Sequence, residues 1–418
     1  VDVDFDNIKD LVVCPNAKNV SNNEKSVHKY LNTGSNSSSN FVFNTDAFLQ
    51  EEMIEHGSGS IPHLMDINND GLLDLFVSNF YAYKDLAQKE SRVAFYQNTG
   101  TNSAPQFTLI DEDFLNLSQL SLGLRLVPSF GDINGDNLPD ILLGLENGTI
   151  AYLENISSGS NISFAPPLLN YTDNNGGIIS VGQYAAPQLF DLNQDGLLDL
   201  IIGNKTGELI YYENTGSSNI PSFTLANNFL GNVDIETQSI NGYAIPSFFN
   251  YNNVIYLMVG AYDGKIHFYD QIQGNITQGQ SFHNISNEFL GIDVGAYSSP
   301  FVSDVDNDGN LNLFLGQDLG GLFHLEHDSL SNLSTNNISN LDQRINIYPN
   351  PCLEELNVHI KTNKKGLRAK IINTQGVIIN LSDLKNGNNT INTKNLPRGI
   401  YFVYVDGYSK LPSRFVKK

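Results

Sequence analysis

Positive charge is scarce in this sequence. Of its 418 residues only 23 are Lys or Arg, against 45 Asp or Glu, so the net charge is −22. Nucleic acids and anionic lipids repel such a chain, and we expect neither as its main partner. No apolar run reaches the roughly 18 residues that a membrane-spanning helix needs, so we expect no transmembrane segment.

Cysteines and recognisable catalytic motifs are also rare. The chain has two cysteines, Cys14 and Cys352, and neither lies beside the His–acid pattern of a nucleophile, so we interpret both as structural and unbridged. It contains no His-Glu-x-x-His, no Gly-x-Ser-x-Gly and no glycine-rich phosphate loop. His324 and His327 look like a metal pair, but side chains three apart on a strand face opposite sides. We therefore assign no catalytic residues.

The charge that is present divides the chain. Residues 1–341 carry 10 basic and 40 acidic residues, whereas residues 342–418 carry 13 and 5. A switch of this size marks a domain boundary. It follows a Ser/Asn-rich stretch without periodicity, which is typical of a linker. We predict a first domain over 1–328, a linker over 329–341 and a second domain over 342–418.

The acidic part repeats one Asp/Asn-rich loop. Five copies of a nine-residue pattern begin at Asp2, Asp66, Asp132, Asp191 and Asp304. A proline lies four residues before the first Asp of each internal copy, and Pro246 precedes Asn250 in the same way. Asn250 therefore marks a sixth, degenerate unit.

Each unit contains strand signals and no helical periodicity. A loop runs into a short apolar run, such as residues 200–202, and further β-rich runs follow within about 60 residues. About four strands per unit, repeated radially, predict an all-β fold, a β-propeller. A β-solenoid has shorter coils, and tandem sandwiches would need about seven strands per unit.

The loops carry the chemistry of a hard cation site. Oxygens at positions 1, 3 and 5, a carbonyl at 7 and a carboxylate at 9 can surround Ca²⁺, which takes about 6–8 such ligands. Glycine at position 6 permits the left-handed turn, and the missing Glu at position 12 excludes an EF-hand. The competing interpretation is a set of Asx-rich turns that bind nothing. The predicted ligands are Asp2, Asp4, Asp6 and Asp10; Asp66, Asn68, Asp70, Leu72 and Asp74; Asp132, Asn134, Asp136, Leu138 and Asp140; Asp191, Asn193, Asp195, Leu197 and Asp199; and Asp304, Asp306, Asp308, Asn310 and Asn312.

These units resemble FG-GAP/VCBS repeats, the blades of integrin-α-type propellers, over residues 1 to about 328. The resemblance implies that a cation binds in the turn between the first two strands of a blade and holds it rigid. Two units depart from the pattern. The Asn250 loop is two residues shorter and lacks carboxylates, so we expect no ion there, and Asn312 replaces the Asp of position 9.

The ends of the repeat array are incomplete. The first unit lacks its proline-bearing strand, and the last runs out near His327. We therefore expect a fragment whose six recognisable units belong to a ring of seven blades, completed by upstream sequence.

The basic part has seven short strand signals in about 75 residues, which predicts an Ig-like sandwich. The motifs at 348–351 and 396–401 and the basic end at 415–418 resemble the type A C-terminal sorting domain of the type IX (Por) secretion system. This implies a Bacteroidetes bacterium, contact of 342–418 with the secretion machinery, and release or anchoring at the outer cell surface. The alternative is an ordinary adhesive Ig-like module.

The leading functional hypothesis is a secreted or cell-surface, Ca²⁺-stabilised binding or adhesion protein without catalysis of its own. Its propeller face would hold an unknown protein or glycan ligand, because propeller faces are built from loops. The alternative is an accessory or partial propeller domain of a secreted enzyme, such as a polysaccharide-degrading hydrolase or lyase.

Overall fold

The computed structural model describes residues 1–14, 26–50, 53–82, 89–159, 161–236, 241–326, 346–360, 366–373, 378–405 and 413–418. The chain divides into two compact units, Val1–Ser329 and Leu330–Lys418. The predicted linker and His327 lie outside the described residues. Among these residues no helix is long and apolar enough to cross a membrane.

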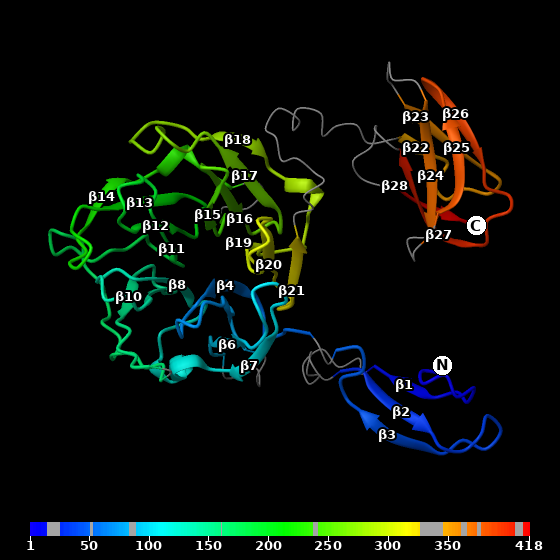
Figure 1. Ribbon diagram of the computed structural model, residues 1–418, viewed down its shortest axis with the longest axis horizontal. Helices are drawn as coiled ribbons and strands as arrows, with labels where there is room; N and C mark the ends of the chain where they lie inside the picture. Colours follow the sequence, from blue (N-terminus) through cyan, green and yellow to red (C-terminus); the bar gives the residue numbers. More distant parts are fainter. Residues whose placement is uncertain are drawn as a thin grey trace. The chain divides into compact units, whose positions relative to one another are not determined.

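Five antiparallel sheets make up most of the first unit (Figure 1). We call them blades one to five. Blade one has β4 (Ile61–Met65), β5 (Asp74–Ser78), β6 (Val93–Asn98) and β7 (Phe107–Asp111); blade two has β8 (Val127–Gly131), β9 (Asp140–Gly144) and β10 (Ile150–Leu153); blade three has β11 (Ala186–Phe190), β12 (Asp199–Gly203), β13 (Leu209–Asn214) and β14 (Phe223–Asn227); blade four has β15 (Ile245–Tyr251), β16 (Val254–Gly260), β17 (Ile266–Asp270) and β18 (His283–Ser286); blade five has β19 (Ser299–Ser303), β20 (Asn312–Gly316) and β21 (Leu322–Glu326). Three short 3₁₀ turns are η1 (Phe114–Leu120), η2 (Leu230–Asn232) and η3 (Phe289–Gly291).

The position of each strand in its blade explains its sequence. Second strands such as β12 are buried along their whole length, which accounts for the apolar runs after the loops. First strands are edge strands at the centre of the ring, where proline is tolerated because no neighbouring strand needs its missing N–H. Prolines of all five first strands line the narrow axial channel together with Ile61 and Val127.

The ring closes between blade five and blade one. The backbone N–H of Ser60 donates to the carbonyl of Gln317 at 3.0 Å, and the Ser299 hydroxyl donates to the carbonyl of Ser60 at 2.6 Å. Leu75 of blade one also shares a buried apolar cluster with Phe314 of blade five. Figure 1 shows the first strands of the five blades around a common centre. The architecture is therefore a propeller, as predicted.

The number of blades corrects the sequence-based expectation. The unit that begins at Asp2 forms a separate three-stranded sheet of β1 (Leu11–Val13), β2 (His28–Asn32) and β3 (Phe41–Thr45). Because five blades already close the ring, it has no gap for this unit or for upstream sequence. The expectation that six units belong to one ring of seven blades is therefore wrong for this ring; similar repeats do not reveal where a ring closes.

The core of the propeller lies between neighbouring blades. Phe76 and Phe95 of blade one pack with Phe130 and Leu143 of blade two, and all four side chains are buried. Equivalent clusters join blade two to blade three and blade three to blade four. A single blade has no such partner, so each blade depends on its neighbours for burial of its faces.

Four glycines at the ends of the second strands let the blades approach closely. A Cβ atom added to Gly144, Gly203, Gly260 or Gly316 would collide with a backbone carbonyl at the start of the next blade. For Gly316 the obstacle is the carbonyl of Ser60, at the closure of the ring. Glycine at the end of the second strand thus marks where one blade packs against the next.

The second unit is a sandwich of two sheets. One sheet has the order β22-β23-β26 and the other β25-β24-β27-β28. The strands are β22 (Asn346–Tyr348), β23 (Glu355–Ile360), β24 (Leu367–Asn373), β25 (Ile378–Leu384), β26 (Gly387–Asn392), β27 (Gly399–Val405) and β28 (Ser413–Lys417). Alternate residues such as Leu356, Val358 and Ile360 point into the core, so the sequence-predicted sandwich is present.

Replacement of Gly316 by valine should loosen the closure of the ring. The new side chain would overlap the Ser60 carbonyl, and overpacking of this kind costs about 1–3 kcal/mol. Urea denaturation measures the loss. The matched control is Gly321→Ala, because the nearest atom to a Cβ there is the end of the flexible Gln317 side chain at 3.3 Å. Equal stability of the two variants would contradict the closure.

Candidate functional site

One repeated backbone hydrogen bond joins the five blades. At the junction of blades two and three the N–H of Tyr184 donates to the carbonyl of Glu146 at 2.9 Å. At the other four junctions, with distances of 2.9 to 3.2 Å, the donor and acceptor pairs are Arg125 and Phe80, Tyr243 and Lys205, Tyr297 and Tyr262, and Gly59 and Asp318. Each donor lies three residues before the proline of a first strand and has a positive φ, from 51° to 67°. The five donors therefore occupy equivalent positions around the axis.

Aromatic side chains of these donors and acceptors gather around the axis at one end of the channel. We call Phe80, Tyr184, Tyr243, Tyr262 and Tyr297 the axial mouth. The ring centroids of Tyr297 lie 5.2 Å from Tyr243 and 5.0 Å from Tyr262, in edge-to-face geometry. The side chain of Tyr262 is 40% exposed and the other four are half-buried, so part of the aromatic surface is accessible to a ligand.

Arg125 lies among these rings. Its guanidinium carbon is 4.8 Å from the ring centroid of Tyr243, 5.6 Å from Tyr297 and 6.0 Å from Tyr184. The residue is only 5% exposed, and burial lowers its pKa to about 10, which leaves it a cation at neutral pH. Its Nη1 atom is buried and has no hydrogen-bond partner among the described residues. The tyrosine faces stabilise the charge, but they supply no hydrogen-bond acceptor in the plane of the guanidinium.

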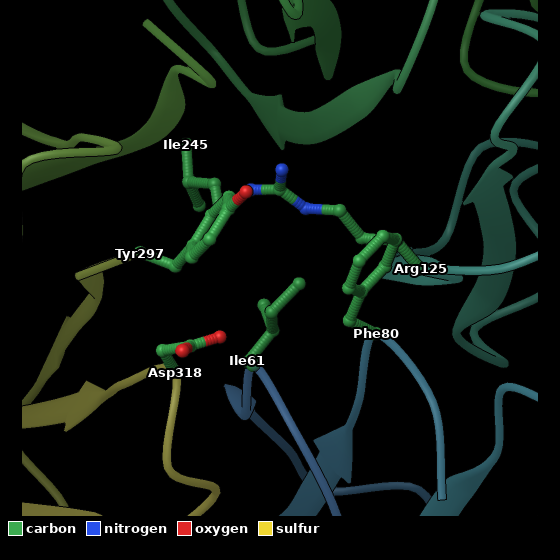
Figure 2. A pocket seen from close by; sticks show the side chains of 7 residues that line it. Ile61, Phe80, Arg125, Ile245, Tyr297 and Asp318 are labelled. Atoms are coloured by element: carbon green, nitrogen blue, oxygen red, sulfur yellow. The ribbon is translucent and has the colours of Figure 1, made fainter. Parts of the chain in front are cut away.

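A small pocket opens beside Arg125 because blade one has glycine where the other blades have arginine or tyrosine. Gly59, Ile61, Phe80 and Asp318 line it. Figure 2 shows the Arg125 side chain extending toward Ile245 and Tyr297, with the Asp318 carboxylate projecting into the pocket from blade five. One oxygen of Asp318 accepts a hydrogen bond from the Ser58 hydroxyl at 3.0 Å.

The Asp/Asn-rich loops connect the first and second strands and are organised by Asx turns. In the loop of blade three, Asp191 accepts a hydrogen bond from the N–H of Gly196 at 3.0 Å, and Asp195 accepts one from Leu197 at 2.9 Å. The loops of blades one, two and five have the same bonds, so positions 1 and 5 stabilise the turn through its backbone.

The residue at position 9 is buried and holds the blade together. Asp199 accepts hydrogen bonds from the N–H groups of Leu192 and Asn214 and from the Tyr211 hydroxyl, at 2.8 to 3.1 Å. Burial raises its pKa to about 6, and the same holds for Asp74 and Asp140. Sequence reasoning identified this position only as a metal ligand and missed its bonds to the third strand.

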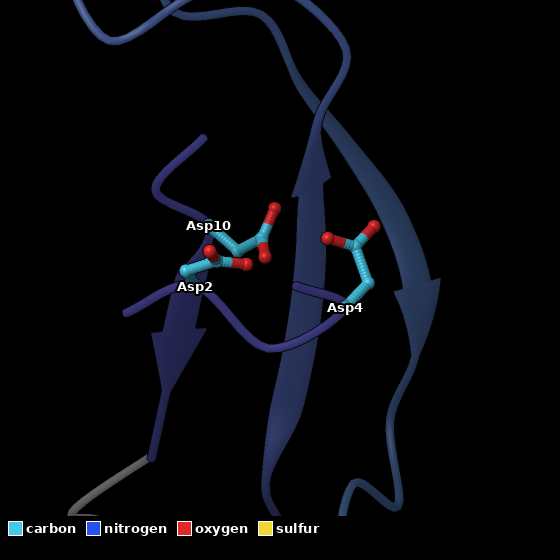
Figure 3. Close-up of side chains that lie close together, drawn as sticks. All are labelled: Asp2, Asp4 and Asp10. Carbon is cyan, nitrogen blue, oxygen red and sulfur yellow. The ribbon is translucent and has the colours of Figure 1, made fainter. Parts of the chain in front are cut away.

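Three acidic side chains come together in two of the loops. One oxygen from each residue of Asp304, Asp306 and Asp308 lies within 4.8 Å of the others, and the same is true of Asp2, Asp4 and Asp10. Figure 3 shows Asp2 beside Asp10, with the carboxylate of Asp4 turned toward them. In the remaining three loops position 3 is occupied by Asn68, Asn134 and Asn193.

The blade-five loop has the donor set of a hard cation site. Oδ1 of Asp306 is buried and has no hydrogen-bond partner among the described residues. A buried carboxylate oxygen without a donor is costly unless a proton or cation neutralises it. The residues present therefore fit Ca²⁺, which prefers carboxylate and carbonyl oxygens.

The degenerate unit lacks the loop altogether. β15 and β16 of blade four are joined by a two-residue turn of Asn252 and Asn253, with φ of 52° and 62°. Positive φ at both residues defines a type I′ hairpin turn, a geometry that asparagine tolerates. This accounts for the two missing residues noted in the sequence.

The remaining sequence signals have structural explanations. Nε2 of His324 lies 3.2 Å from the Asn312 side-chain nitrogen, and its ring stacks on Phe314. Both cysteines are free thiols, with Cys14 exposed and Cys352 buried. In the second unit the Tyr401 hydroxyl donates to the carbonyl of Pro397 at 3.0 Å, within the motif at 396–401.

Two families match parts of the chain. Residues 346–418 match the family described as the secretion system C-terminal sorting domain, and residues 66–143 match the FG-GAP-like repeat. The chain is an FG-GAP-repeat propeller followed by a secretion sorting domain. The second match covers the loops of blades one and two, and the first covers all seven strands of the sandwich.

The sorting domain determines where the protein goes. Such a domain marks a protein that the type IX (Por) secretion system of Bacteroidetes delivers to the cell surface or the medium. This sorting domain ends on an edge of the sandwich, where the Cys352 N–H donates to the Val416 carbonyl at 2.8 Å and the Lys418 N–H donates to the Cys352 carbonyl at 3.0 Å. The C-terminal strand is thus held by the start of the domain, next to the basic end.

A search of the curated proteins found no match. Among solved structures, PorZ, a surface component of the type-IX secretion system of Porphyromonas gingivalis, is 11% identical with a TM-score of 0.29, and the match covers 94% of this chain and 63% of that one. AofleA from Arthrobotrys oligospora is 12% identical with a TM-score of 0.37 and coverages of 73% and 77%. Trypanosoma rangeli sialidase is 9% identical with a TM-score of 0.34 and coverages of 97% and 92%. These similarities are too weak to support a conclusion about this chain.

Deletion of residues 342–418 should retain the protein in the periplasm of a type IX-competent host, because the export signal lies in that domain. Fusion of the same residues to a periplasmic reporter should move the reporter to the surface or medium. Fractionation and immunoblotting measure both. Surface delivery of the truncated propeller at full yield would contradict the assignment.

Proposed function

We propose that this protein is an exported binding or adhesion protein whose Ca²⁺-stabilised propeller holds a protein or glycan ligand at the axial mouth, without catalysis of its own. The observation that carries the proposal is the convergence of partly exposed aromatic rings from different blades around the buried Arg125.

The position of the mouth supports a binding role. Its rings are attached directly beside the hydrogen bonds that join the blades, so the ring architecture holds them in place. Aromatic side chains are large and lose little conformational freedom on binding, which makes them effective contact residues at interfaces. A mouth assembled from four blades also exists only in the closed ring.

Calcium would act on the loops rather than at the mouth. In the blade-five loop Asp304, Asp306 and Asp308 would hold the ion, with Asn310 providing the carbonyl of position 7. When bound, the ion would neutralise carboxylates that otherwise repel one another in a folded turn. The equivalent positions in the other loops would bind in the same way, and blade four, with its two-residue turn, would bind none.

Removal of calcium should lower the melting temperature of the full chain. A site with 100 times its dissociation constant of calcium gains about 2.7 kcal/mol of stability. In calorimetric titration, Asp306→Ala should lower the number of Ca²⁺ ions bound per chain by about one. Asn253→Gly should leave that number unchanged, because it alters a turn without ligands. An unchanged melting curve after EGTA treatment, in protein shown to be metal-free, would contradict the calcium proposal.

Tyr262→Ala tests the mouth. Loss of this exposed ring should weaken binding of the full chain to whichever polysaccharides or proteins it retains in a panel, by about tenfold or more if Tyr262 is an anchor residue. The matched control is Phe323→Ala, an aromatic residue of blade five that is 47% exposed on β21. Equal losses in both variants would place the binding surface elsewhere. Release of reducing ends from the same polysaccharides would contradict the absence of catalysis.

A further inference from the structure

The pocket beside Arg125 differs from the rest of the axial mouth because it combines a gap with an unsatisfied charge. Three of the five equivalent positions place a tyrosine against the axis, and the fourth is Arg125. The fifth is Gly59, so the pocket lies where a side chain is missing. A Cβ atom at Gly59 would already lie 3.0 Å from the Cβ of Phe80, at the pocket wall.

The charge of Arg125 has no counterion in the described part of the chain. The nearby carboxylate of Glu146 accepts hydrogen bonds from the Leu124 N–H at 2.8 Å and from the Tyr184 hydroxyl at 3.2 Å, and no ion pair joins it to Arg125. Arg125 is more than nine-tenths buried, with Nη1 lacking an acceptor. Leaving a buried charged donor unpaired is costly, so a ligand that supplies an acceptor gains more here than at an exposed arginine.

We propose that this pocket binds the carboxylate of an acidic sugar, with Arg125 as the residue that recognises the charge. The inference rests on the proposed binding function and adds the chemical class of the ligand. A planar guanidinium matches a carboxylate through parallel N–H···O bonds.

The other walls of the pocket favour a sugar over a peptide carboxylate. Asp318 projects into the pocket, and a carboxylate accepts hydrogen bonds from hydroxyl groups, of which a pyranose offers several. The phenol ring of Tyr297, which also lines the pocket, provides a flat apolar surface on which the carbon face of a sugar ring can pack. The net charge of the propeller repels anions at long range, but salt screens this repulsion beyond about 8 Å at physiological ionic strength.

Calorimetric titration of the full chain tests the proposal with four probes: D-galacturonate, its neutral methyl ester, D-galactose and N-acetylglycine. We expect galacturonate to bind at least about tenfold more tightly than the ester or galactose, because these lack the charged acceptor. N-acetylglycine carries a carboxylate without the sugar ring and should bind about tenfold more weakly than galacturonate. Equal affinity for the ester would overturn the role of the charge, and equal affinity for N-acetylglycine would overturn the sugar class.

Two variants locate the site. Arg125→Lys keeps the positive charge but removes the planar guanidinium with its parallel N–H donors. Gly59→Asn fills the pocket with a side chain whose residue type tolerates positive φ. Each variant should abolish galacturonate binding. The control is Lys265→Gln, which removes a cation that pairs with Glu288 at 3.2 Å outside the pocket; this variant should still bind galacturonate. Melting curves establish that the variants fold. The comparison of galacturonate with its methyl ester uses the native chain, so it does not depend on the folding of any variant.

The result separates this inference from the proposed function. Undiminished galacturonate binding in both pocket variants, or no binding of galacturonate by the native chain, would overturn the inference. In either case a panel ligand that is lost in Tyr262→Ala would leave the binding function standing.

Discussion

The structure depends on the close backbone contact between neighbouring blades. The N–H of the residue three before each proline meets a carbonyl of the preceding blade, and at four of the five junctions a glycine lets the next blade approach. Because the blades bury their apolar faces only against each other, this contact determines both where the hydrophobic core forms and how the ring closes. The hydrogen bond from the Gly59 N–H to the Asp318 carbonyl joins blade one to blade five, so this fifth junction is equivalent to the other four.

The same contact creates the axial mouth. A residue is held at positive φ beside each of the five junctions, and at four of them it projects a side chain toward the axis, the fifth being Gly59. The ring thus brings Arg125 close to three tyrosines, although each of these residues lies about 60 positions from the next in the chain. A change of one side chain at an equivalent position therefore alters the chemistry at the axis without altering the blades. The pocket at Gly59 is an example of this freedom.

The Asp/Asn loops combine two roles that the sequence pattern does not separate. Positions 1 and 5 bond to the backbone of the loop, whereas Asp199 and its equivalents bond to the third strand from a buried position. Asn312 makes the corresponding bond to the N–H of Val305 at 3.0 Å, so an amide suffices for the structural role at position 9. Position 9 therefore stabilises the blade whether or not an ion binds to the loop.

The sequence by itself determined the fold class, the repeating unit and the sorting domain, because these depend on local patterns. Short apolar runs and prolines at a constant offset mark the blades, and the second unit has the seven strands that the sequence predicts. Only the tertiary structure decided the number of blades, because closure depends on how blade five meets blade one and not on how many units resemble each other. It also decided the site, because no sequence motif marks Arg125. Arg125 is a candidate binding residue only because tyrosines of three other blades surround it in the fold and leave its Nη1 atom without a hydrogen-bond acceptor.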